Sequence, residues 1–426
     1  MIRRLFIANR GEIALRVIRT AHRLGITTIL AVSEADADSL PARLADEVRP
    51  VASYLSIEAL IGAAKAAGAD AIHPGYGFLS ENAAFARAAA TAGIIFVGPD
   101  PATLDAMGDK LEARRIAREA GLPLVPGREG GYPLLIKAVA GGGGRGMKKV
   151  ERAEELEPAM AMAAAEAEAA FGDGRLYVER FIASGRHVEV QILGDGTRAI
   201  HLGDRDCSIQ RRFQKLVEEA PAPCLPDETR EALRSAAVRL AAYLHYRGAG
   251  TVEFLVDAAT SDFYFLEMNP RIQVEHPVTE AVTGIDLVEQ QLLIAAGEPL
   301  GLSQETIALD GHAIEARINA EEWRHDFRPS PGTIRRAAWP AGPGIRVDSH
   351  IAAGGKVPPL YDSLIGKLIV SGRNRAEAVA RLRAALDALE IEGVETTTGL
   401  HRAIASDPRF TAGAVDSRFF EGFSHA

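Results

Sequence analysis

The sequence predicts an α/β region followed by an α+β region, with a small glycine-rich module between them. Three observations support this prediction. Strand and helix patterns alternate over the first hundred residues, residues 141 to 144 are four consecutive glycines, and long strands dominate from residue 186 onward. Alternating βαβ units form parallel sheets, whereas successive long strands favour antiparallel pairing with interspersed helices.

The N-terminal part reads as a series of βαβ units. Residues 2 to 8 predict a strand, residues 11 to 24 carry apolar side chains at helical spacing, and TTILAV predicts a second strand. DAIHPGYGFLSENAAFARAAATAGIIFVGP then predicts strand, glycine-rich loop, helix and strand, with the helix capped near Ser80 and Glu81 following. We expect an open parallel sheet to about residue 100, with HPGYGFLSEN at the carboxyl end of one strand.

A helical segment from about residue 103 to residue 120 and a break from Gly121 to Pro126 are predicted next. Beyond the glycine run, an alanine-rich helix is expected near residues 153 to 170. The later strands are HVEVQILGD, TRAIHLGDRDCS, TVEFLVDA, FYFLEMN, GHAIEARINA and LIGKLIVSG, and a helix over residues 375 to 389 follows them.

The glycine run lies in PLLIKAVAGGGGRGMKKV, between two extended segments. The spacings of a Walker loop and of a dinucleotide-binding loop are both absent, so we expect a hairpin flap that closes over a ligand. Lys137 on the entering strand and Arg145 at the tip would then face anionic oxygens. A disordered surface loop is the alternative interpretation of the same glycines.

Composition limits the classes of function. The 426 residues allow two or three domains, and 47% hydrophobic with 25% charged residues is ordinary for a soluble globular protein. A net charge of -9 argues against sequence-independent nucleic-acid binding. Cys207 and Cys224 lack metal-ligand spacing, which favours a reducing compartment. Without a secretory signal or an apolar span, we expect a cytoplasmic protein that is not attached to a membrane.

Polar side chains alternate along FYFLEMNPRIQVEHPVTE. Glu267, Asn269, Arg271, Gln273 and Glu275 all have odd numbers, so a continuous strand would direct them to one face. A solvated strand face is the usual reason for such a pattern.

The preceding strand suggests a metal site instead. A hairpin through TVEFLVDAATSDFYFLEMN would place Leu255 opposite Phe265 and Glu253 opposite Glu267. Opposing carboxylates repel one another, and a cation such as Mg²⁺ would remove the conflict, with Asn269 as a further oxygen ligand.

Cationic residues surround this predicted site. Arg271 is placed to bind a planar anion, and Glu275 is available as a base. In GHAIEARINAE, Arg317 alternates with apolar residues and either joins the pocket or forms a surface ion pair. A cluster in DRDCSIQRRFQKLVEEAPAP is either a solvated basic loop or part of the anion site, and its members are Arg205, Arg211, Arg212 and Lys215.

The chain resembles a known family over nearly its whole length. IANRGEIA, HPGYGFLSEN, MGDK, GGGGRGM, EMNPRIQVEHPVTE, RINAE and YDSLIGK follow the order found in biotin carboxylase, the ATP-grasp component of biotin-dependent carboxylases. The resemblance implies an ATP-grasp fold with four parts: a Rossmann-like domain over residues 1–102, a helical linker over 103–124, a lid domain over 125–181, and the ATP-grasp and C-terminal biotin carboxylase domain over 182–426.

The resemblance also implies a reaction. MgATP activates bicarbonate as carboxyphosphate, which carboxylates N1 of biotin, so ATP, two Mg²⁺ (or Mn²⁺) ions and carrier-bound biotin are expected. The implied partners are a biotin carboxyl carrier protein or domain, a carboxyltransferase component and a second copy of the chain. No lysine-centred motif such as AMKM is present, so we expect the carrier on another chain or domain.

Residue roles follow from the same resemblance. Glu275 would be the base, Arg317 would stabilise the enolate of biotin, and both belong to a catalytic set with Arg271 and Lys215. Bicarbonate would be held by Lys215, Arg271, Gln273, Val274 and Glu275. The metal ligands would be Glu253, Glu267 and Asn269. ATP would contact Lys110, Lys137, Gly142, Gly143, Gly144, Gly146, Met147, Glu179, Ile182, His187 and Gln210.

Some positions depart from the family pattern. Phe213 stands where histidine is common near the ATP ribose, and Arg180 and Phe181 replace the usual lysine and tyrosine. Only GREGG separates Pro126 from Tyr132, where relatives carry another helix. Two other hypotheses therefore stay open: another ATP-grasp ligase that does not use biotin, and a nucleotide-binding subunit that has lost turnover.

Overall fold

A five-stranded parallel sheet forms the N-terminal region of the computed structural model, which describes residues 2–140 and 146–423. Its order is β3-β2-β1-β4-β5, and every neighbouring pair is parallel, which confirms the predicted sheet. The elements are β1 (Arg4–Ile7), α1 (Gly11–Arg23), β2 (Thr27–Val32), η1 (Glu34–Asp36), α2 (Leu40–Leu44), β3 (Glu47–Pro50), α3 (Ile57–Ala66), β4 (Ala71–His73), α4 (Ala83–Thr91) and β5 (Ile95–Phe96).

Helix α4 begins later than the sequence predicted. Its N-cap is Asn82, whose side-chain oxygen accepts a hydrogen bond from the backbone N–H of Phe85 at 2.9 Å. An N-cap oxygen must reach an N–H two or three residues further on, and Ser80 is instead buried in the preceding loop. The loop HPGYGFLSEN therefore extends up to the helix at the carboxyl end of β4, as the open-sheet prediction requires.

His73 ends β4 and fixes the start of this loop. Its Nδ1 accepts a hydrogen bond from Gly75 N at 3.0 Å, so the ring proton lies on Nε2, 3.1 Å from the side-chain oxygen of Gln291. Burial lowers the pKa of His73 to about 4, which keeps the ring neutral in the folded protein.

Acid is therefore expected to destabilise the fold through His73. The pKa of His73 is lower in the folded protein than in the unfolded chain. The stability that the neutral ring contributes is therefore complete above about pH 6.5 and is lost as the pH falls toward 4. Between pH 7 and pH 5, a His73→Gln variant should lose about 2 kcal/mol less unfolding free energy than the parent. Urea unfolding at both pH values measures the difference, and equal losses would rule out His73 as the cause.

The predicted helical segment over residues 103 to 120 consists of two helices in the structure. Asp109 ends the first and caps the second: its carboxylate accepts from Leu111 N at 2.9 Å and Glu112 N at 3.1 Å. This capping interrupts the helix and starts the second one at Lys110. The two helices are α5 (Pro101–Gly108) and α6 (Lys110–Glu119).

A small three-stranded antiparallel sheet forms the glycine-flap module. Strands β6 and β7 pair with Lys137 opposite Met147, which confirms that the glycine run connects two strands. Gly142, Gly143, Gly144 and Arg145 lie outside the described residues. The elements are η2 (Arg128–Gly130), β6 (Leu134–Ala138), β7 (Met147–Val150), α7 (Ala153–Phe171) and β8 (Leu176–Arg180).

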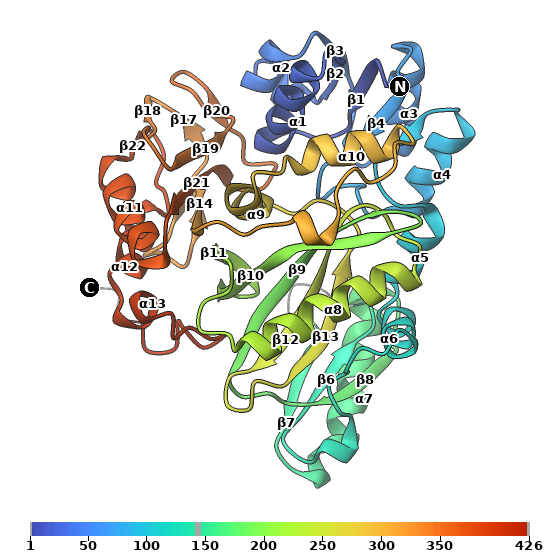
Figure 1. Ribbon diagram of the computed structural model, residues 1–426, viewed down its shortest axis with the longest axis vertical. Helices are drawn as coiled ribbons and strands as arrows, with labels where there is room; N and C mark the ends of the chain where they lie inside the picture. The colour runs from blue at the N-terminus through green and yellow to red at the C-terminus, as the bar shows by residue number, and fades with distance from the viewer. Residues whose placement is uncertain (1, 141–145, 424–426) are drawn as a thin grey trace.

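An eight-stranded antiparallel sheet forms the centre of the molecule, in the order β13-β12-β9-β10-β11-β14-β21-β19. Figure 1 shows α8 lying across this sheet, with α11, α12 and α13 at the end away from the flap module. Its strands are β9 (Gly185–Asp195), β10 (Ala199–Arg211), β11 (Gln214–Ala220), β12 (Arg247–Asp257), β13 (Phe263–Asn269), β14 (His312–Asn319), β19 (Ile345–Ser349) and β21 (Leu364–Gly372).

Two apolar clusters pack helices against this sheet, one around α8 and one around α11. Leu233 and Leu240 of α8 pack in one cluster with Val190 and Phe254, and Leu382 of α11 packs in another with residues of β14 and β21. None of the helices in the described ranges is long and apolar enough to cross a bilayer.

The remaining elements complete the chain around the central sheet. The helices among them are α8 (Asp227–Tyr243), α9 (His276–Thr283), α10 (Leu287–Ala295), η3 (Gln304–Thr306), α11 (Arg375–Ala388), α12 (Thr398–Ser406) and α13 (Pro408–Ala412). The remaining strands are β15 (Glu321–Glu322), β16 (Arg328–Pro329), β17 (Gly332–Thr333), β18 (Arg336–Ala338), β20 (Lys356–Val357) and β22 (Glu390–Glu392).

Candidate active site

A cavity of about 1000 Å³ is lined by residues of the parallel-sheet region, the flap module and the central sheet. Among the described residues, every sequence-predicted site residue except Gly146 lines it. Those lining residues are Lys110, Lys137, Met147, Glu179, Ile182, His187, Gln210, Lys215, Glu253, Glu267, Asn269, Arg271, Gln273, Val274, Glu275 and Arg317.

The two carboxylates predicted to oppose each other do so, because Glu253 of β12 pairs with Glu267 of β13. The predicted pairing of Leu255 with Phe265 is wrong. A bulge after Glu253 gives β13 one extra residue, so Phe254 pairs with Phe265, and Leu255 pairs with Tyr264. The pairing of Glu253 with Glu267 itself is unaffected, so the metal prediction keeps its geometric basis.

The predicted continuous strand through Glu275 is also wrong, because β13 ends at Asn269. Pro270 has no backbone N–H and cannot continue the hydrogen-bond ladder, and Glu275 lies at the N-cap of α9. The intervening loop nevertheless returns to the same cavity, which Arg271 and Gln273 both line. Alternation along a strand therefore cannot explain why these side chains lie together.

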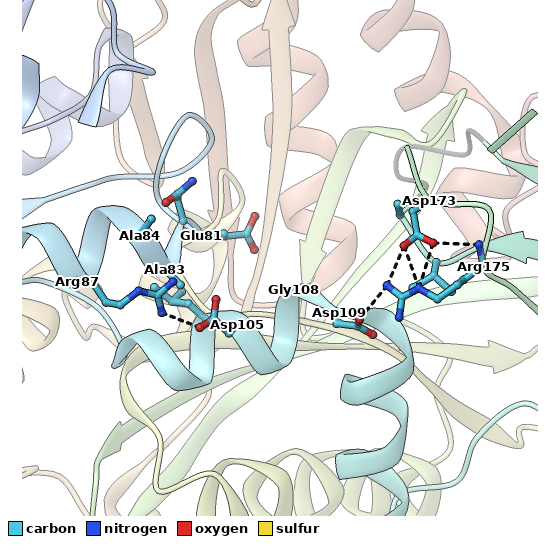
Figure 2. Close-up of a pocket in the computed structure, with 13 residues that line it drawn as sticks. Glu81, Ala83, Ala84, Arg87, Asp105, Gly108, Asp109, Asp173 and Arg175 are labelled. Carbon is cyan, nitrogen blue, oxygen red and sulfur yellow. Dashed lines mark hydrogen bonds and ion pairs between the residues drawn. The ribbon is translucent and has the colours of Figure 1, made fainter. Parts of the chain in front are cut away.

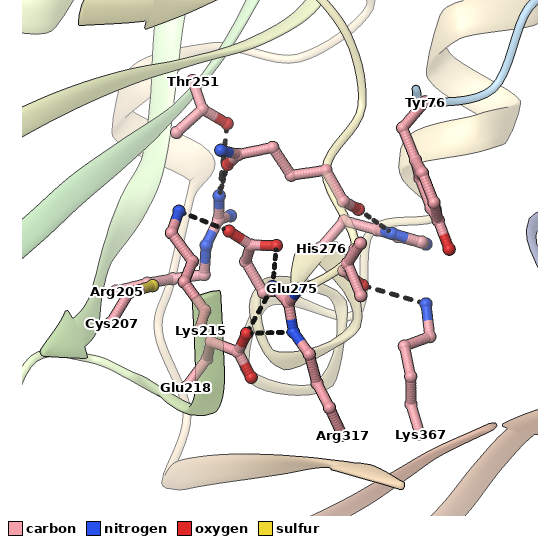
Figure 3. A network of polar contacts seen from close by, with 12 residues as sticks. Tyr76, Arg205, Cys207, Lys215, Glu218, Thr251, Glu275, His276, Arg317 and Lys367 are labelled. Atoms are coloured by element: carbon pink, nitrogen blue, oxygen red, sulfur yellow. Dashed lines mark hydrogen bonds and ion pairs between the residues drawn. The ribbon is translucent and has the colours of Figure 1, made fainter. Parts of the chain in front are cut away.

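Lys215 lies at the centre of an acidic cluster on the central sheet, and Figure 3 shows its contact with Glu275. Its Nζ is 2.6 Å from Glu189 Oε2, 2.9 Å from Glu253 Oε1 and 2.7 Å from Glu275 Oε1. Burial alone would lower the pKa of Lys215, but the three carboxylates raise it well above its ordinary value. The ammonium group is therefore charged, and it provides a fixed positive centre at the cavity wall.

Arg317 contacts the other oxygen of the same glutamate. Its Nη2 lies 2.9 Å from Glu275 Oε2 and 2.5 Å from Glu218 Oε1. Burial raises the pKa of Glu275, but the charges of Lys215 and Arg317 outweigh this effect and hold it below the ordinary value. Glu275 is thus an ionised carboxylate at the cavity, which a general base requires. Burial raises the pKa of Glu218 to about 7, although the adjacent Arg317 opposes the shift.

The acidic pair offers donors that suit a hard divalent cation. Burial and the charge of Glu253 raise the pKa of Glu267, which is the conflict that a bound cation would relieve. The Asn269 amide donates to Glu253 Oε1 at 2.8 Å, and its oxygen accepts from Arg271 Nη2 at 2.8 Å. Two carboxylates and an amide oxygen fit Mg²⁺, with the amide oxygen shared with Arg271.

A second group of cavity residues lies toward the flap module. Glu179 of β8 forms ion pairs with Lys137 and with Arg114 of α6. On the adjacent wall, Gln210 Nε2 lies 3.1 Å from His187 Nδ1, and His187 Nε2 lies 2.8 Å from Glu253 Oε2. The cavity therefore joins a lysine-rich wall at the flap to the acidic cluster on the central sheet.

Sequence reasoning missed several residues that build this site. Arg114 follows Lys110 by four residues on a helix, and this spacing was the available signal. Glu189 alternates with apolar residues in HVEVQILGD, so its strand face was predictable but its partner was not. Glu218 and Lys367 were also missed, and Lys367 Nζ donates to Val274 O at 2.9 Å.

The predicted basic cluster of the β10–β11 hairpin divides into two groups. Lys215 belongs to the cavity and Arg205 is fully buried, so a solvated loop is the wrong interpretation for both. Arg211 and Arg212 instead contact the exposed carboxylate of Asp326 at 2.5 Å and 2.8 Å. Arg211 ends β10 and Arg212 lies in the turn that follows it, with a positive φ of 49°.

The positions that depart from the family pattern also line the cavity. Phe213 is 59% exposed, and Arg180 and Phe181 belong to the same cavity lining. Arg180 Nη2 donates to the Tyr264 hydroxyl at 3.2 Å, and Lys149 Nζ lies 4.3 Å from the centre of the Phe181 ring. Within GREGG, residues Arg128–Gly130 form the short 3₁₀ helix η2.

A second hollow of about 440 Å³ lies between α4, α5 and the flap module (Figure 2). Arg87 pairs with Asp105 at 2.7 Å, Arg175 pairs with Asp173 at 2.8 Å and Asp109 at 3.2 Å, and Glu81 pairs with Arg271 of the larger cavity at 3.2 Å. None of the predicted site residues within the described ranges lines it. The larger cavity is therefore the candidate active site.

Comparisons with known proteins cover the whole chain. Residues 1–104 match the family "Biotin carboxylase, N-terminal domain", residues 109–303 match "Carbamoyl-phosphate synthase L chain, ATP binding domain", and residues 315–422 match "Biotin carboxylase C-terminal domain". The chain is 50% identical to a biotin carboxylase of Nostoc sp. over an alignment of 440 positions that covers 98% of each protein. It is 48% identical to a biotin carboxylase of Pseudomonas aeruginosa, covering 99% of the chain and 98% of that protein.

Solved structures agree with these matches. A biotin carboxylase complex from Campylobacter jejuni superposes with a TM-score of 0.95 at 46% identity, covering 99% of each chain. The biotin carboxylase domain dimer of the Hydrogenobacter thermophilus 2-oxoglutarate carboxylase, solved with MgADP, ADP and bicarbonate, gives a TM-score of 0.94 at 45% identity. It covers 100% of this chain and 99% of that chain.

Proposed function

The chain belongs to the biotin carboxylase family, and from this premise we propose that its cavity carries out the MgATP-dependent carboxylation of biotin by bicarbonate. The fold is the ATP-grasp fold, and the protein is an ATP-dependent ligase. The observation that supports this function best is the placement of Glu275. Its two carboxylate oxygens contact Lys215 and Arg317, and the Glu253–Glu267 pair lies next to them. A base, an anion site and a metal site therefore lie together in one cavity.

The first step uses the cationic side of the cavity. Lys215 and Arg271 attract bicarbonate, and Gln273 supplies a further polar contact at the cavity wall. Glu275 takes the proton of the bicarbonate hydroxyl, and the freed oxygen attacks the γ-phosphorus of ATP, so that ADP leaves and carboxyphosphate forms. A cation held by Glu253, Glu267 and Asn269 would neutralise negative charge on the phosphate oxygens.

The second step uses Arg317. When biotin N1 loses its proton to a phosphate oxygen of carboxyphosphate, negative charge develops on the ureido oxygen, and a guanidinium at the cavity wall stabilises it. N1 then takes the carboxyl group of carboxyphosphate, and phosphate leaves. Glu218 and Glu275 both form ion pairs with Arg317 and fix its position. A fixed guanidinium can stabilise a charge that forms only during the reaction without having to reorient.

ATP binding is assigned to the flap side of the same cavity. Lys110 and Lys137 are positioned for the phosphates, with Gly146 and Met147 at the described end of the flap. Glu179, Ile182, His187 and Gln210 would surround the nucleoside. The further partners proposed are a biotin carboxyl carrier protein or domain, a carboxyltransferase component and a second copy of the chain.

One assay tests this function directly. ADP release should require bicarbonate and should rise when free biotin or a biotinylated carrier is added. An ADP rate that biotin does not change would contradict the proposal, and turnover with an amine instead would identify another ATP-grasp ligase. Calorimetric binding of MgATP without any turnover would identify a nucleotide-binding subunit.

A further inference from the structure

Arg205 of β10 is a fully buried guanidinium with a partner for every N–H group. Its side chain is 0% exposed, and it does not line the cavity. A guanidinium has five N–H donors and no acceptor, so complete pairing inside a protein needs five oxygens in a fixed arrangement. The five acceptors are Glu189 Oε1 at 2.6 Å, Gln191 Oε1 at 2.7 Å, Thr279 Oγ1 at 2.9 Å, Thr251 Oγ1 at 3.2 Å and Gln273 Oε1 at 2.7 Å.

The contact with Gln273 fixes the direction of its amide. Because Arg205 only donates, the amide must turn its oxygen toward the guanidinium and its NH₂ group away. Gln273 Nε2 accordingly donates to Glu253 Oε1 at 2.8 Å, on the side of the acidic pair and the cavity. Arg205 therefore makes Gln273 a donor at a site proposed to bind an anion.

The contact of Arg205 with Glu189 supports Lys215, the second residue proposed to bind the anion. Glu189 Oε1 accepts from Arg205, and Glu189 Oε2 lies 2.6 Å from Lys215 Nζ. Figure 3 shows Arg205 near Thr251 and Lys215. Gln273 and Lys215 come from different elements, so one buried side chain holds two separate parts of the anion site in register.

We propose that Arg205 is a positioning residue for bicarbonate: it orients the Gln273 amide and anchors Glu189 beneath Lys215. This inference rests on the proposed function of the cavity. The five acceptors of Arg205 belong to residues to which no ATP contact is assigned, so we expect Arg205 to act on the anion rather than on ATP. Lysine cannot replace it, because a single ammonium group cannot reach five acceptors that surround a planar fork.

The test is an Arg205→Lys variant of the full chain. The KM for bicarbonate in ADP release should rise about 10- to 100-fold, as is usual when a supporting contact behind a ligand-binding residue is lost, and the KM for ATP should stay unchanged. Arg212→Lys is the matched control, because this arginine lies just past the same strand on the surface and should change neither constant. An unchanged bicarbonate KM, or an equal rise in both constants, would overturn the proposal.

A double-mutant cycle tests the route through Gln273. Gln273→Met should raise the bicarbonate KM in the parent and add little in the Arg205→Lys background, because the amide is no longer oriented there. Fully additive effects would overturn this route.

Thr279→Val tests the positioning role of Arg205 if the Arg205→Lys variant does not fold. It removes one acceptor of Arg205 without changing a cavity-lining residue, and it should raise the bicarbonate KM to a smaller extent. An unchanged bicarbonate KM would overturn the proposal. A parent chain without bicarbonate-dependent ADP release would instead overturn the proposed function itself, so the two failures are distinguishable.

Discussion

Glu275→Gln is expected to abolish bicarbonate-dependent ADP release while leaving MgATP binding intact. Glutamine has the same shape, but its amide cannot accept the proton of bicarbonate at neutral pH. It also turns an NH₂ group toward Lys215 or Arg317, where an oxygen now lies within 2.9 Å of each. Loss of general-base catalysis costs about 10²- to 10⁴-fold in kcat, so little turnover should remain.

Steady-state ADP release and calorimetric titration with MgATP measure the two effects separately. Glu322→Gln is the matched control, because Glu322 pairs with Arg328 on the surface outside the cavity and should change neither quantity. A parent-like kcat for Glu275→Gln would remove Glu275 from the role of base. A large loss of MgATP binding would show instead that the variant disturbs the nucleotide side of the cavity.

Local patterns predicted much of the fold and part of the site. The opposition of Glu253 and Glu267 was predictable because both residues belong to one hairpin, where a short turn limits the register. The alternation in GHAIEARINAE likewise placed Arg317 on the face opposite Ile314 and Ile318, which lie in an apolar cluster.

Contacts that depend on the order of strands were not predictable. Lys215 meets Glu189 because β9 and β11 are both neighbours of β10, and no local pattern fixes that arrangement. Arg317 meets Glu275 only because β14 lies beside β11 and α9 begins nearby. The turn at Pro270 was visible in the sequence, but the odd-numbered spacing suggested a strand, and the proline prevented it.

Glu267→Gln is expected to change stability and activity in opposite directions. In the metal-free protein, burial and the charge of Glu253 raise the pKa of Glu267, so the ionised side chain destabilises the fold at neutral pH. Removing its charge should therefore raise the unfolding free energy without metal. The same change removes a carboxylate ligand, and a loss of about 1.4 kcal/mol or more in cation binding raises the Mg²⁺ concentration for half-maximal ADP release at least about tenfold.

Urea unfolding in a chelator and a Mg²⁺ titration of ADP release measure the two halves of this prediction. Asp262→Asn is the matched control, because Asp262 lies in the turn of the same hairpin outside the cavity and contacts Thr260. A stability gain without a shift in Mg²⁺ dependence would mean that the cation binds elsewhere. A shift without a stability gain would mean that the two carboxylates do not repel in the metal-free protein. Only a stability gain together with a shift in Mg²⁺ dependence identifies a metal site at Glu253 and Glu267. In such a site the two carboxylates repel each other without the cation, and both bind the cation when it is present.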